Sequence, residues 1–465
     1  MTRVAGDEVS TSRSLVCERV VAHDLCIGCG VCAAVCPADQ LTVGWSDRGC
    51  YTVTEKRGQC LDGCSLCAQV CPFADDNPNE DDLSYDSYSR VPQVRRSPEL
   101  GYFMSCYAGY SRRGDQRANG ASGGLATWFL TELLRRGVVS HVACVQARPG
   151  SKPLFEYTIC DTLEQVESGA KSAYYPVEAS GVLERILSGE GRYAVVCLPC
   201  VAKSLRLAGR RLPCLAERLV CVVGLVCGHG ANAYFAEYAA ALADPEAGPP
   251  SRVTFRTKNP RLPATEHGIE CSWRGADNKT VYWSQGLGRA WSGYWFTPIP
   301  CLYCDDVFAE TADVAFMDAW LPRYMPDYRG TNLVVTRSQL AEDILRSADR
   351  SSDIHLEPCS AEDLARSQAT ALCEKRDALS YRLCLAGQQG RRVPQKRVPD
   401  SPTGSALQRL LWRSRMRAAQ IGPGEWLKRD SLRSFVRRMP RTASVLPLVR
   451  LLRKMVRRLI QLSRR

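Results

Sequence analysis

The chain has 465 residues, enough for two to four domains, and its 45% hydrophobic content is ordinary for a globular protein with a substantial core. The net charge of +12 comes from one end, because residues 401–465 hold seventeen Lys and Arg against Glu425 and Asp430. No apolar run is long enough to span a membrane. The sequence has no aromatic platform or recognised nucleic-acid fold, so the basic end does not indicate nucleic-acid binding.

Twenty-four cysteines are unusual for a chain of this size. Secreted proteins use many cysteines as disulfides, whereas reduced thiolates in a cytoplasm are free to bind metal. Residues 1–20, expected to be flexible, carry Asp7, Glu8 and Glu18 and no apolar stretch of the kind found in signal peptides. We therefore expect a cytoplasmic protein with metal-bound cysteines.

Residues 21–74 contain two cysteine-rich runs separated by short strands expected at 41–45 and 51–54. The first run ends at Cys36-Pro37 and has the spacing C-x₂-C-x₂-C-x₃-C-P, typical of bacterial ferredoxins that hold cubic iron–sulfur clusters. The second ends at Cys71-Pro72 and has one extra residue in its first gap. We predict a two-cluster ferredoxin module; two zinc sites or a disulfide framework are the alternatives.

In two-cluster ferredoxins the fourth cysteine of each run ligates the other cluster. That rule predicts two sets of four metal ligands, each drawn from both runs. The first set is Cys26, Cys29, Cys32 and Cys71, and the second set is Cys60, Cys64, Cys67 and Cys36.

The rest of the chain is expected to be α/β, with a β-rich part and a tail. Residues 75–101 are rich in Asp, Asn, Ser and Pro and are expected to be a linker that wraps the next domain. Residues 102–248 alternate between helical and strand patterns, which indicates α/β layers, and residues 249–387 are richer in strand patterns. Helices are expected at 125–136, 182–187 and 201–208, and strands at 138–145, 193–197, 219–227, 253–256, 269–273, 280–283 and 312–320.

Residues 388–465 form a basic tail. Its first part, residues 388–424, is polar and interrupted by prolines, so weak order is expected. Residues 445–460 place apolar side chains at helical spacing with Arg and Lys on the other side. A basic amphipathic helix of this kind predicts binding to a membrane surface or packing on a partner subunit.

Two further groups of residues are candidates for chemistry. Ser122-Gly123-Gly124 precedes a helix, where backbone N–H groups and the helix dipole favour a phosphate, although the turn fits neither the dinucleotide nor the P-loop fingerprint. Four cysteines, Cys200, Cys227, Cys301 and Cys304, lie at strand ends or in a turn, where a third cluster could form. Nine other cysteines are expected to be buried apolar thiols: Cys106, Cys144, Cys160, Cys214, Cys221, Cys271, Cys359, Cys373 and Cys384.

Several short motifs occur in one order along residues 102–385. They are Ser122-Gly123-Gly124, Lys171-Ser172-Ala173-Tyr174, Leu198-Pro199-Cys200, Val226-Cys227-Gly228-His229, Phe255-Arg256-Thr257-Lys258, Cys301-x₂-Cys304-Asp305 and Ala312-Asp313-Val314 with Asp318-Ala319-Trp320. This ordered set resembles the family formed by the beta subunits of coenzyme F420 hydrogenases and dehydrogenases (F420 is a deazaflavin cofactor).

The resemblance implies a flavin-binding body in which FAD exchanges a hydride with F420 and passes single electrons to iron–sulfur clusters. It assigns Ser122, Gly123 and Gly124 to the FAD phosphates. It places Lys171, Ser172 and Tyr174 near the flavin or the substrate, and Cys200, Cys227, Cys301 and Cys304 at a third cluster. Lys171, Arg256 and Lys258 would neutralise phosphate or carboxylate groups.

The sequence identifies no catalytic acid, and His229 is expected to be structural. The redox partner is expected to be a ferredoxin or a catalytic subunit. Two other functions stay open: a ferredoxin-dependent reductase of an organic substrate such as a tetrapyrrole or a glycan precursor, and a subunit that only conducts electrons within a larger complex.

Overall fold

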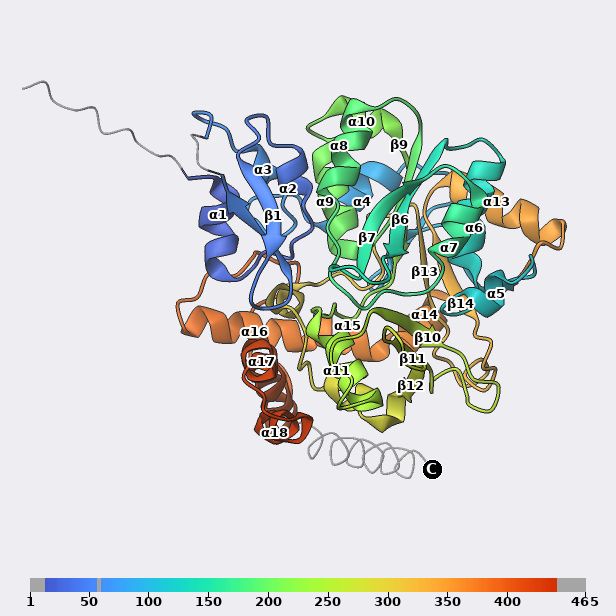
Figure 1. Ribbon diagram of the computed structural model, residues 1–465. Coiled ribbons are helices and arrows are strands. Elements are labelled where there is room, and N and C mark those ends of the chain that lie inside the picture. Colours follow the sequence, from blue (N-terminus) through green and yellow to red (C-terminus); the bar gives the residue numbers. More distant parts are fainter. Residues whose placement is uncertain (1–12, 57–59, 441–465) are drawn as a thin grey trace, which may run out of the picture.

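The computed structural model describes residues 13–56 and 60–440 (Figure 1). Its N-terminal module pairs β1 (Leu41–Trp45) with β2 (Tyr51–Glu55) in an antiparallel hairpin, which confirms the two expected strands. Helices α2 (Val31–Ala34) and α3 (Leu66–Gln69) carry the third cysteine of each run, and α1 (Leu15–Arg19) and η1 (Val21–His23) precede them.

The body is built on one eight-stranded mixed sheet in the order β15-β5-β14-β13-β9-β8-β6-β7. Four central strands, β13, β9, β8 and β6, are parallel, and antiparallel strands extend the sheet on both sides. The strands are β5 (Cys106–Ser111), β6 (His141–Ala147), β7 (Phe155–Cys160), β8 (Tyr193–Cys197), β9 (Leu219–Leu225), β13 (Val314–Asp318), β14 (Asn332–Thr336) and β15 (Ile354–Pro358).

Helices cover both faces of this sheet (Figure 1). One face carries α8 (Ser180–Ser188), α9 (Pro199–Gly209) and α10 (Pro213–Arg218), which lie between the sheet and the N-terminal module. The other carries α6 (Leu125–Arg135), α7 (Leu163–Ser168) and α13 (Gln339–Arg350). The expected helices and strands of residues 102–248 are therefore confirmed in type, with ends displaced by a few residues.

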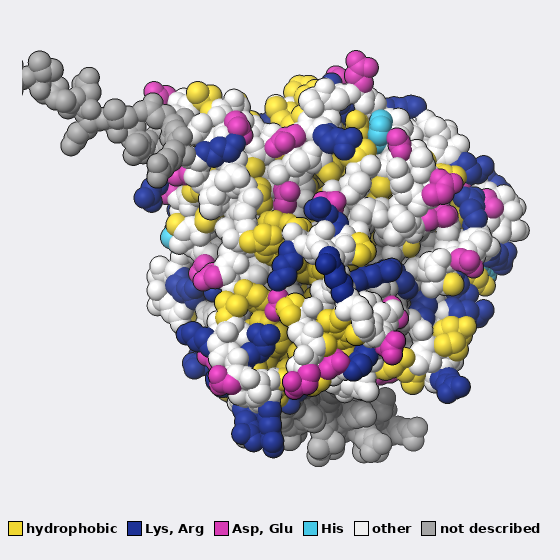
Figure 2. Space-filling model, in the orientation of Figure 1, with side chains coloured by type: hydrophobic (Ala, Val, Ile, Leu, Met, Phe, Trp, Pro, Cys, Tyr) yellow, Lys and Arg dark blue, Asp and Glu magenta, His cyan; other side chains and the backbone are white. Residues whose placement is uncertain are grey.

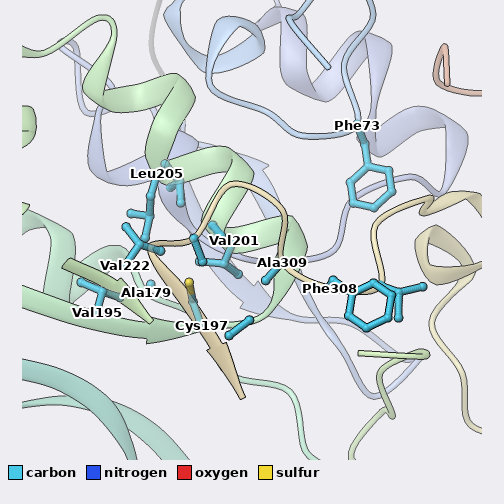
Figure 3. Close-up of a cluster of buried hydrophobic side chains, with 14 of the residues drawn as sticks. Phe73, Ala179, Val195, Cys197, Val201, Leu205, Val222, Phe308 and Ala309 are labelled. Carbon is cyan, nitrogen blue, oxygen red and sulfur yellow. The ribbon is translucent and has the colours of Figure 1, made fainter. Parts of the chain in front are cut away.

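The N-terminal module and the body share one hydrophobic core. Figure 3 shows Phe73 of the module in the same cluster of buried side chains as Val201 and Leu205 of α9 and Val222 of β9. Polar contacts join the same parts, because the Ala179 N–H donates to the carbonyl of Cys29 at 2.9 Å. The module is thus packed against α8 and α9 rather than held only by its linker.

Residues 75–101 contain strand β3 (Arg95–Ser97), which pairs with β4 (Gly101–Phe103), and a helix that lies along the body. This helix, α4 (Glu80–Tyr88), begins at Asn79, whose side chain accepts two backbone N–H groups in a capping box. The Tyr88 hydroxyl donates to the Thr311 carbonyl at 3.0 Å, and Glu80 pairs with Lys203 of α9 at 3.3 Å.

A second, antiparallel sheet of β10 (Arg252–Thr257), β11 (Gly268–Ser272) and β12 (Lys279–Tyr282) packs on α11 (Tyr234–Ala243). It confirms the strands expected at 253–256, 269–273 and 280–283. Short helices follow it: η2 (Trp283–Gln285), α12 (Leu287–Ser292), η3 (Ile299–Tyr303), α14 (Ala361–Ser367), α15 (Ala369–Lys375) and α16 (Asp377–Gln388).

The weak order expected for residues 388–424 is wrong. Helix α17 (Ala406–Leu427) runs through this region, and α18 (Leu432–Arg438) follows. Trp412, Met416 and Ala419 of α17 are buried at helical spacing. Arginines surround this apolar stripe in the sequence, so composition alone did not predict the helix. The amphipathic helix expected at 445–460 lies outside the described residues. Within the described ranges, no helix has both the length and the apolar character needed to cross a membrane.

Candidate iron–sulfur and cofactor sites

The first predicted ligand set surrounds a hollow in the N-terminal module. The thiols of Cys26, Cys29, Cys32 and Cys71 line one small hollow together with apolar groups such as Val16. Burial, helped by the neighbouring Cys26, raises the pKa of the Cys29 thiol to about 11. An apolar hollow lined by four thiols fits a cubic cluster, whose cations would offset this cost of forming thiolates.

The second predicted set also comes together. Burial raises the pKa of the Cys60 thiol, and the nearby Cys64 and Cys36 also raise it. Burial likewise raises the pKa of the Cys67 thiol, together with the nearby Cys60 and Cys64. Each set therefore combines three cysteines of one run with the fourth of the other, as the ferredoxin pattern predicts. Iron ligation by both sets stays a prediction.

In the part of the chain that the structure describes, no three His, Cys, Asp or Glu side chains converge tightly enough to hold a single metal ion. A cubic cluster differs from a single ion because it presents a separate iron to each thiolate. Its ligands therefore surround a volume instead of meeting at a point, as the thiols around the first hollow do.

The four cysteines proposed for a third cluster are brought together from three segments. Cys200 lies in the first turn of α9 just after β8, Cys227 follows β9, and Cys301 and Cys304 lie in and after η3. Burial is the main cause that raises the pKa of Cys200, followed by the charges of Cys304, Cys301 and Cys227. The Gly230 N–H donates to the Cys301 sulfur at 3.4 Å.

A lysine completes this third thiol group. Lys375, the last residue of α15, is 3% exposed, and its ammonium donates to the Cys304 sulfur at 3.1 Å and to the Asp306 carbonyl at 2.5 Å. Burial lowers its pKa, but negative charge on Cys304 and Cys227 outweighs burial and raises the pKa above the usual range. The sequence reasoning missed Lys375, because α15 is short and its sequence carries no motif.

Helix α9 joins the third thiol group to the first hollow. Cys200 belongs to the third group, and Ser204, one helical turn further along, lines the hollow of the first ligand set. One turn of helix advances about 5.4 Å, so the two sites are near neighbours. Cys29 also contributes to the raised pKa of Cys200.

The Ser122-Gly123-Gly124 turn is tightly packed at the start of α6. A Cβ on Gly123 would lie 2.6 Å from the Gly109 carbonyl oxygen, and Gly124 has a positive φ of 79°. The Leu125 N–H at the helix start is bonded to the Asn332 side chain at 3.0 Å. Close packing against the sheet therefore explains the glycines without a ligand, and a phosphate role for the turn stays a prediction.

Basic side chains gather beside this turn. Lys258 donates to the carbonyls of Ser122, at 2.8 Å, and Arg117, and Arg256 donates to the Ala121 carbonyl at 3.2 Å. Burial lowers the pKa of Lys258 to about 7, helped by the positive charges of Lys171, Arg256 and Arg117.

These four basic residues, Arg117, Lys171, Arg256 and Lys258, are hereafter the cation group. Two of its members have carboxylate partners: Arg256 pairs with Asp318 at 2.6 Å and Arg117 with Asp327 at 3.1 Å. Figure 2 shows Lys and Arg side chains near the middle of one face of the molecule, with apolar side chains between them. A positive group of this kind fits a polyanion such as a pyrophosphate.

Aromatic rings connect the cation group to the third thiol group. The Tyr174 ring contacts Phe255, next to Arg256, with centroids 5.4 Å apart, and contacts Trp291 at 4.9 Å. Trp291 in turn packs on His229, two residues after Cys227, at 4.2 Å. Ser172 hydrogen-bonds to the Tyr174 side chain, which is half-buried. The structure thus brings all the cofactor-binding residues expected from the sequence to one side of the third thiol group.

His229 packs between aromatic rings and is not placed for proton transfer. Its ring lies 4.3 Å from Tyr294, and its Nδ1 lies 3.0 Å from the Gly230 carbonyl. Burial lowers its pKa to about 4, so the ring is neutral near pH 7.

Of the nine cysteines expected to be buried, five are and four are half-buried. The buried residues are Cys106, Cys144, Cys160, Cys221 and Cys271, and the half-buried residues are Cys214, Cys359, Cys373 and Cys384.

The mixed sheet and the docked cysteine-rich module define an iron–sulfur redox protein, and comparison with known families supports this. Residues 25–74 match the family described as "4Fe-4S dicluster domain". Residues 106–184 match the N-terminal region of the coenzyme F420 hydrogenase/dehydrogenase beta subunit, and residues 190–362 match the C-terminal region of the same protein. The chain belongs to this family of coenzyme F420 hydrogenase/dehydrogenase beta subunits, with a 4Fe-4S dicluster domain in front.

Two similar proteins come from species of Methanosarcina. One of the subunits of the F(420)H(2) dehydrogenase of Methanosarcina mazei is 24% identical over 214 residues, which are 45% of this chain and 54% of the relative. The chain therefore spans about half the length of that curated relative. A solved structure of the F420-reducing NiFe hydrogenase complex from Methanosarcina barkeri contains a chain with 15% identity and a TM-score of 0.46, covering 60% of this chain and 92% of that chain.

Proposed function

We propose that the protein is a flavin and iron–sulfur oxidoreductase that exchanges a hydride with coenzyme F420 and single electrons with a partner protein. The observation that carries this proposal is the position of the third thiol group. It lies one turn of α9 from the first ligand set on one side and is joined by aromatic rings to the cation group on the other.

The cation group would hold the pyrophosphate of FAD. Lys258 and Lys171 are half-buried, and in the described part of the chain neither has a carboxylate oxygen within 4.0 Å, so a bound anion would supply the missing counter-charge and raise the lowered pKa of Lys258. Tyr174, Phe255 and Trp291 provide an apolar wall for a planar ring system. When bound, a flavin supplies the conversion between a hydride and single electrons that clusters alone cannot perform.

The thiol groups would provide the path for single electrons. The chain's own contribution is burial: Cys32, Cys67 and Cys71 are among the buried thiols, and Cys200 lies in the interface between α9 and the module. Burial excludes water from the clusters and keeps neighbouring sites at fixed separations. The proposed order runs from the cation group to the third thiol group, then to the first and second ligand sets.

The partner would be a redox subunit or a ferredoxin that docks on the N-terminal module, in the cytoplasm. The second ligand set would be the exposed end of the path, because the residues between Cys60 and Cys64, which are Leu61, Asp62 and Gly63, are exposed. Residues 445–460 would attach the protein to a membrane surface or to that partner.

The test is a spectroscopic titration of the anaerobically purified protein, whose flavin content is measured first. Reduced F420 should bleach the flavin absorbance within the time of mixing and then reduce the clusters. Bleaching by reduced ferredoxin but not by reduced F420 would contradict the proposal and favour a ferredoxin-dependent reductase. Purified protein that binds no FAD and shows only cluster signals would favour a subunit that conducts electrons without its own substrate.

A further inference from the structure

Lys375 is a buried cation without a matching carboxylate. Its ammonium donates to the Cys304 sulfur at 3.1 Å and to the Asp306 carbonyl, and in the described part of the chain no carboxylate oxygen lies within 4.0 Å of it. An isolated buried ammonium is very costly, because the interior cannot replace its hydration. The site must therefore supply negative charge from another source.

Other buried basic residues nearby do have carboxylate partners. The Lys396 side chain is 4% exposed and pairs with Asp305 at 3.4 Å, and Arg397 pairs with Glu310 at 2.8 Å. Lys203 pairs with Glu80 at 3.3 Å. Lys375 differs from these residues because the acidic group that it contacts directly is the Cys304 thiol, while the Asp306 carboxylate attracts it from beyond 4.0 Å.

The first two ligand sets have a different electrostatic environment. The leading charged neighbours of Cys32 are other cysteines, and those of Cys60 are Cys64 and Cys36. The third thiol group, in contrast, has an ammonium in hydrogen-bond contact. A cation close to a cluster stabilises its more negative, reduced form, and hydrogen bonds to the sulfurs act in the same direction.

We infer that Lys375 is a tuning residue that raises the reduction potential of a cluster held by Cys200, Cys227, Cys301 and Cys304, so that this cluster is the preferred electron acceptor of the three. The inference rests on the proposed third cluster. The inference sets the order of electron transfer. An electron that leaves a flavin bound beside the cation group is first held at the third cluster, beside Lys375, and then passes to the N-terminal module.

The test compares reduction potentials of the intact protein, followed by electron paramagnetic resonance during an anaerobic redox titration. Lys375→Met should lower the potential of the third cluster so that its reduction is at least about ten-fold less favourable, which corresponds to about 59 mV for one electron. Lys375→Arg keeps the charge and should restore the potential. Lys279→Met is the control, because Lys279 is exposed and paired with Asp244 outside the third thiol group, and it should leave the potential unchanged.

A second measurement uses the unaltered chain, in case Lys375→Met fails to fold. Protein labelled with ¹⁵N-lysine should show a nitrogen coupling to the reduced third cluster in pulsed resonance spectra, and Lys375→Arg should remove it. No coupling, or an unchanged potential in a Lys375→Met protein that still holds about twelve irons, overturns the inference. About eight irons in the unaltered protein would instead refute the third cluster itself.

Discussion

At the scale of single residues, the charges are the informative feature, and sequence alone could not place them. The motif residues Arg256 and Lys258 could be named from the resemblance, but Arg117 could not, because it lies in no motif and reaches the site only through the packing of the turn. Lys375 was missed for the same reason. The groups that contact these basic side chains come from distant parts of the chain, so no local sequence pattern identifies them.

Lys258 gives a prediction about pH. Its pKa is lowered to about 7, so part of the population is neutral at pH 8, and an anion bound beside it would raise the pKa again. Binding of inorganic pyrophosphate at pH 8 should therefore take up protons, and affinity should fall as the pH rises through 7. Calorimetry in buffers of different ionisation enthalpy measures the uptake.

The control for this titration is Lys279→Gln, because Lys279 is exposed and paired with Asp244 away from the cation group. Lys258→Gln should abolish most of the proton uptake, while Lys279→Gln should leave it unchanged. Equal uptake by the unaltered protein and Lys258→Gln would show that the anion binds elsewhere.

At the scale of elements, patterns predicted the central strands and helices well, because these are apolar runs with a clear period. β8 was located to the residue, and α6, α8 and α9 were located within a few residues. The miss was α17, whose apolar stripe is interrupted by arginines and whose partner, the core around Trp295, lies far away in sequence. Tertiary packing there outweighs local composition.

The packing explanation for the glycine turn before α6 can be tested by adding one methyl group to Gly123. Gly123→Ala would place a Cβ 2.6 Å from the Gly109 carbonyl oxygen and 2.8 Å from the Asn332 nitrogen, which are both backbone atoms. Overpacking of this kind should destabilise the fold by about 1–3 kcal/mol and lower the thermal midpoint. Gly181→Ala in α8 is the control, because nothing lies within 4 Å of its Cβ position. A midpoint equal to that of the control would contradict the packing explanation.

The C-terminal tail can be tested with two deletions, one that includes residues packed on the body and one limited to residues 441–465. Deleting residues 405–465 would remove Trp426 and Phe435, which pack at 5.7 Å on Phe296 and Trp295 respectively, so the thermal midpoint should fall and the protein should aggregate. Deleting only residues 441–465 should leave the midpoint and the iron content unchanged but abolish binding to anionic liposomes, measured by co-sedimentation. Liposome binding that survives the shorter deletion would reject a membrane role for residues 445–460.

At the scale of the whole molecule, the cysteine-rich module and the body form one continuous structure. The shared core around Phe73, Val201 and Leu205 and the position of α9 between two thiol groups would keep the proposed electron path short and fixed. The sequence could predict the module from its spacing and the body from its motifs. It could not predict their docking, because the contact between Ser204 and the module, at 2.6 Å to the Val70 carbonyl, has no sequence pattern.

The most direct test of this account is the variant Cys301→Ser, studied anaerobically with flavin and iron measured together. We predict that iron falls from about twelve to about eight per chain, that reduced F420 still bleaches the flavin, and that reduction of the module's clusters slows by an order of magnitude or more. Reduction of those clusters at the unaltered rate, with all their iron retained, would contradict the claim that electrons pass through the third thiol group.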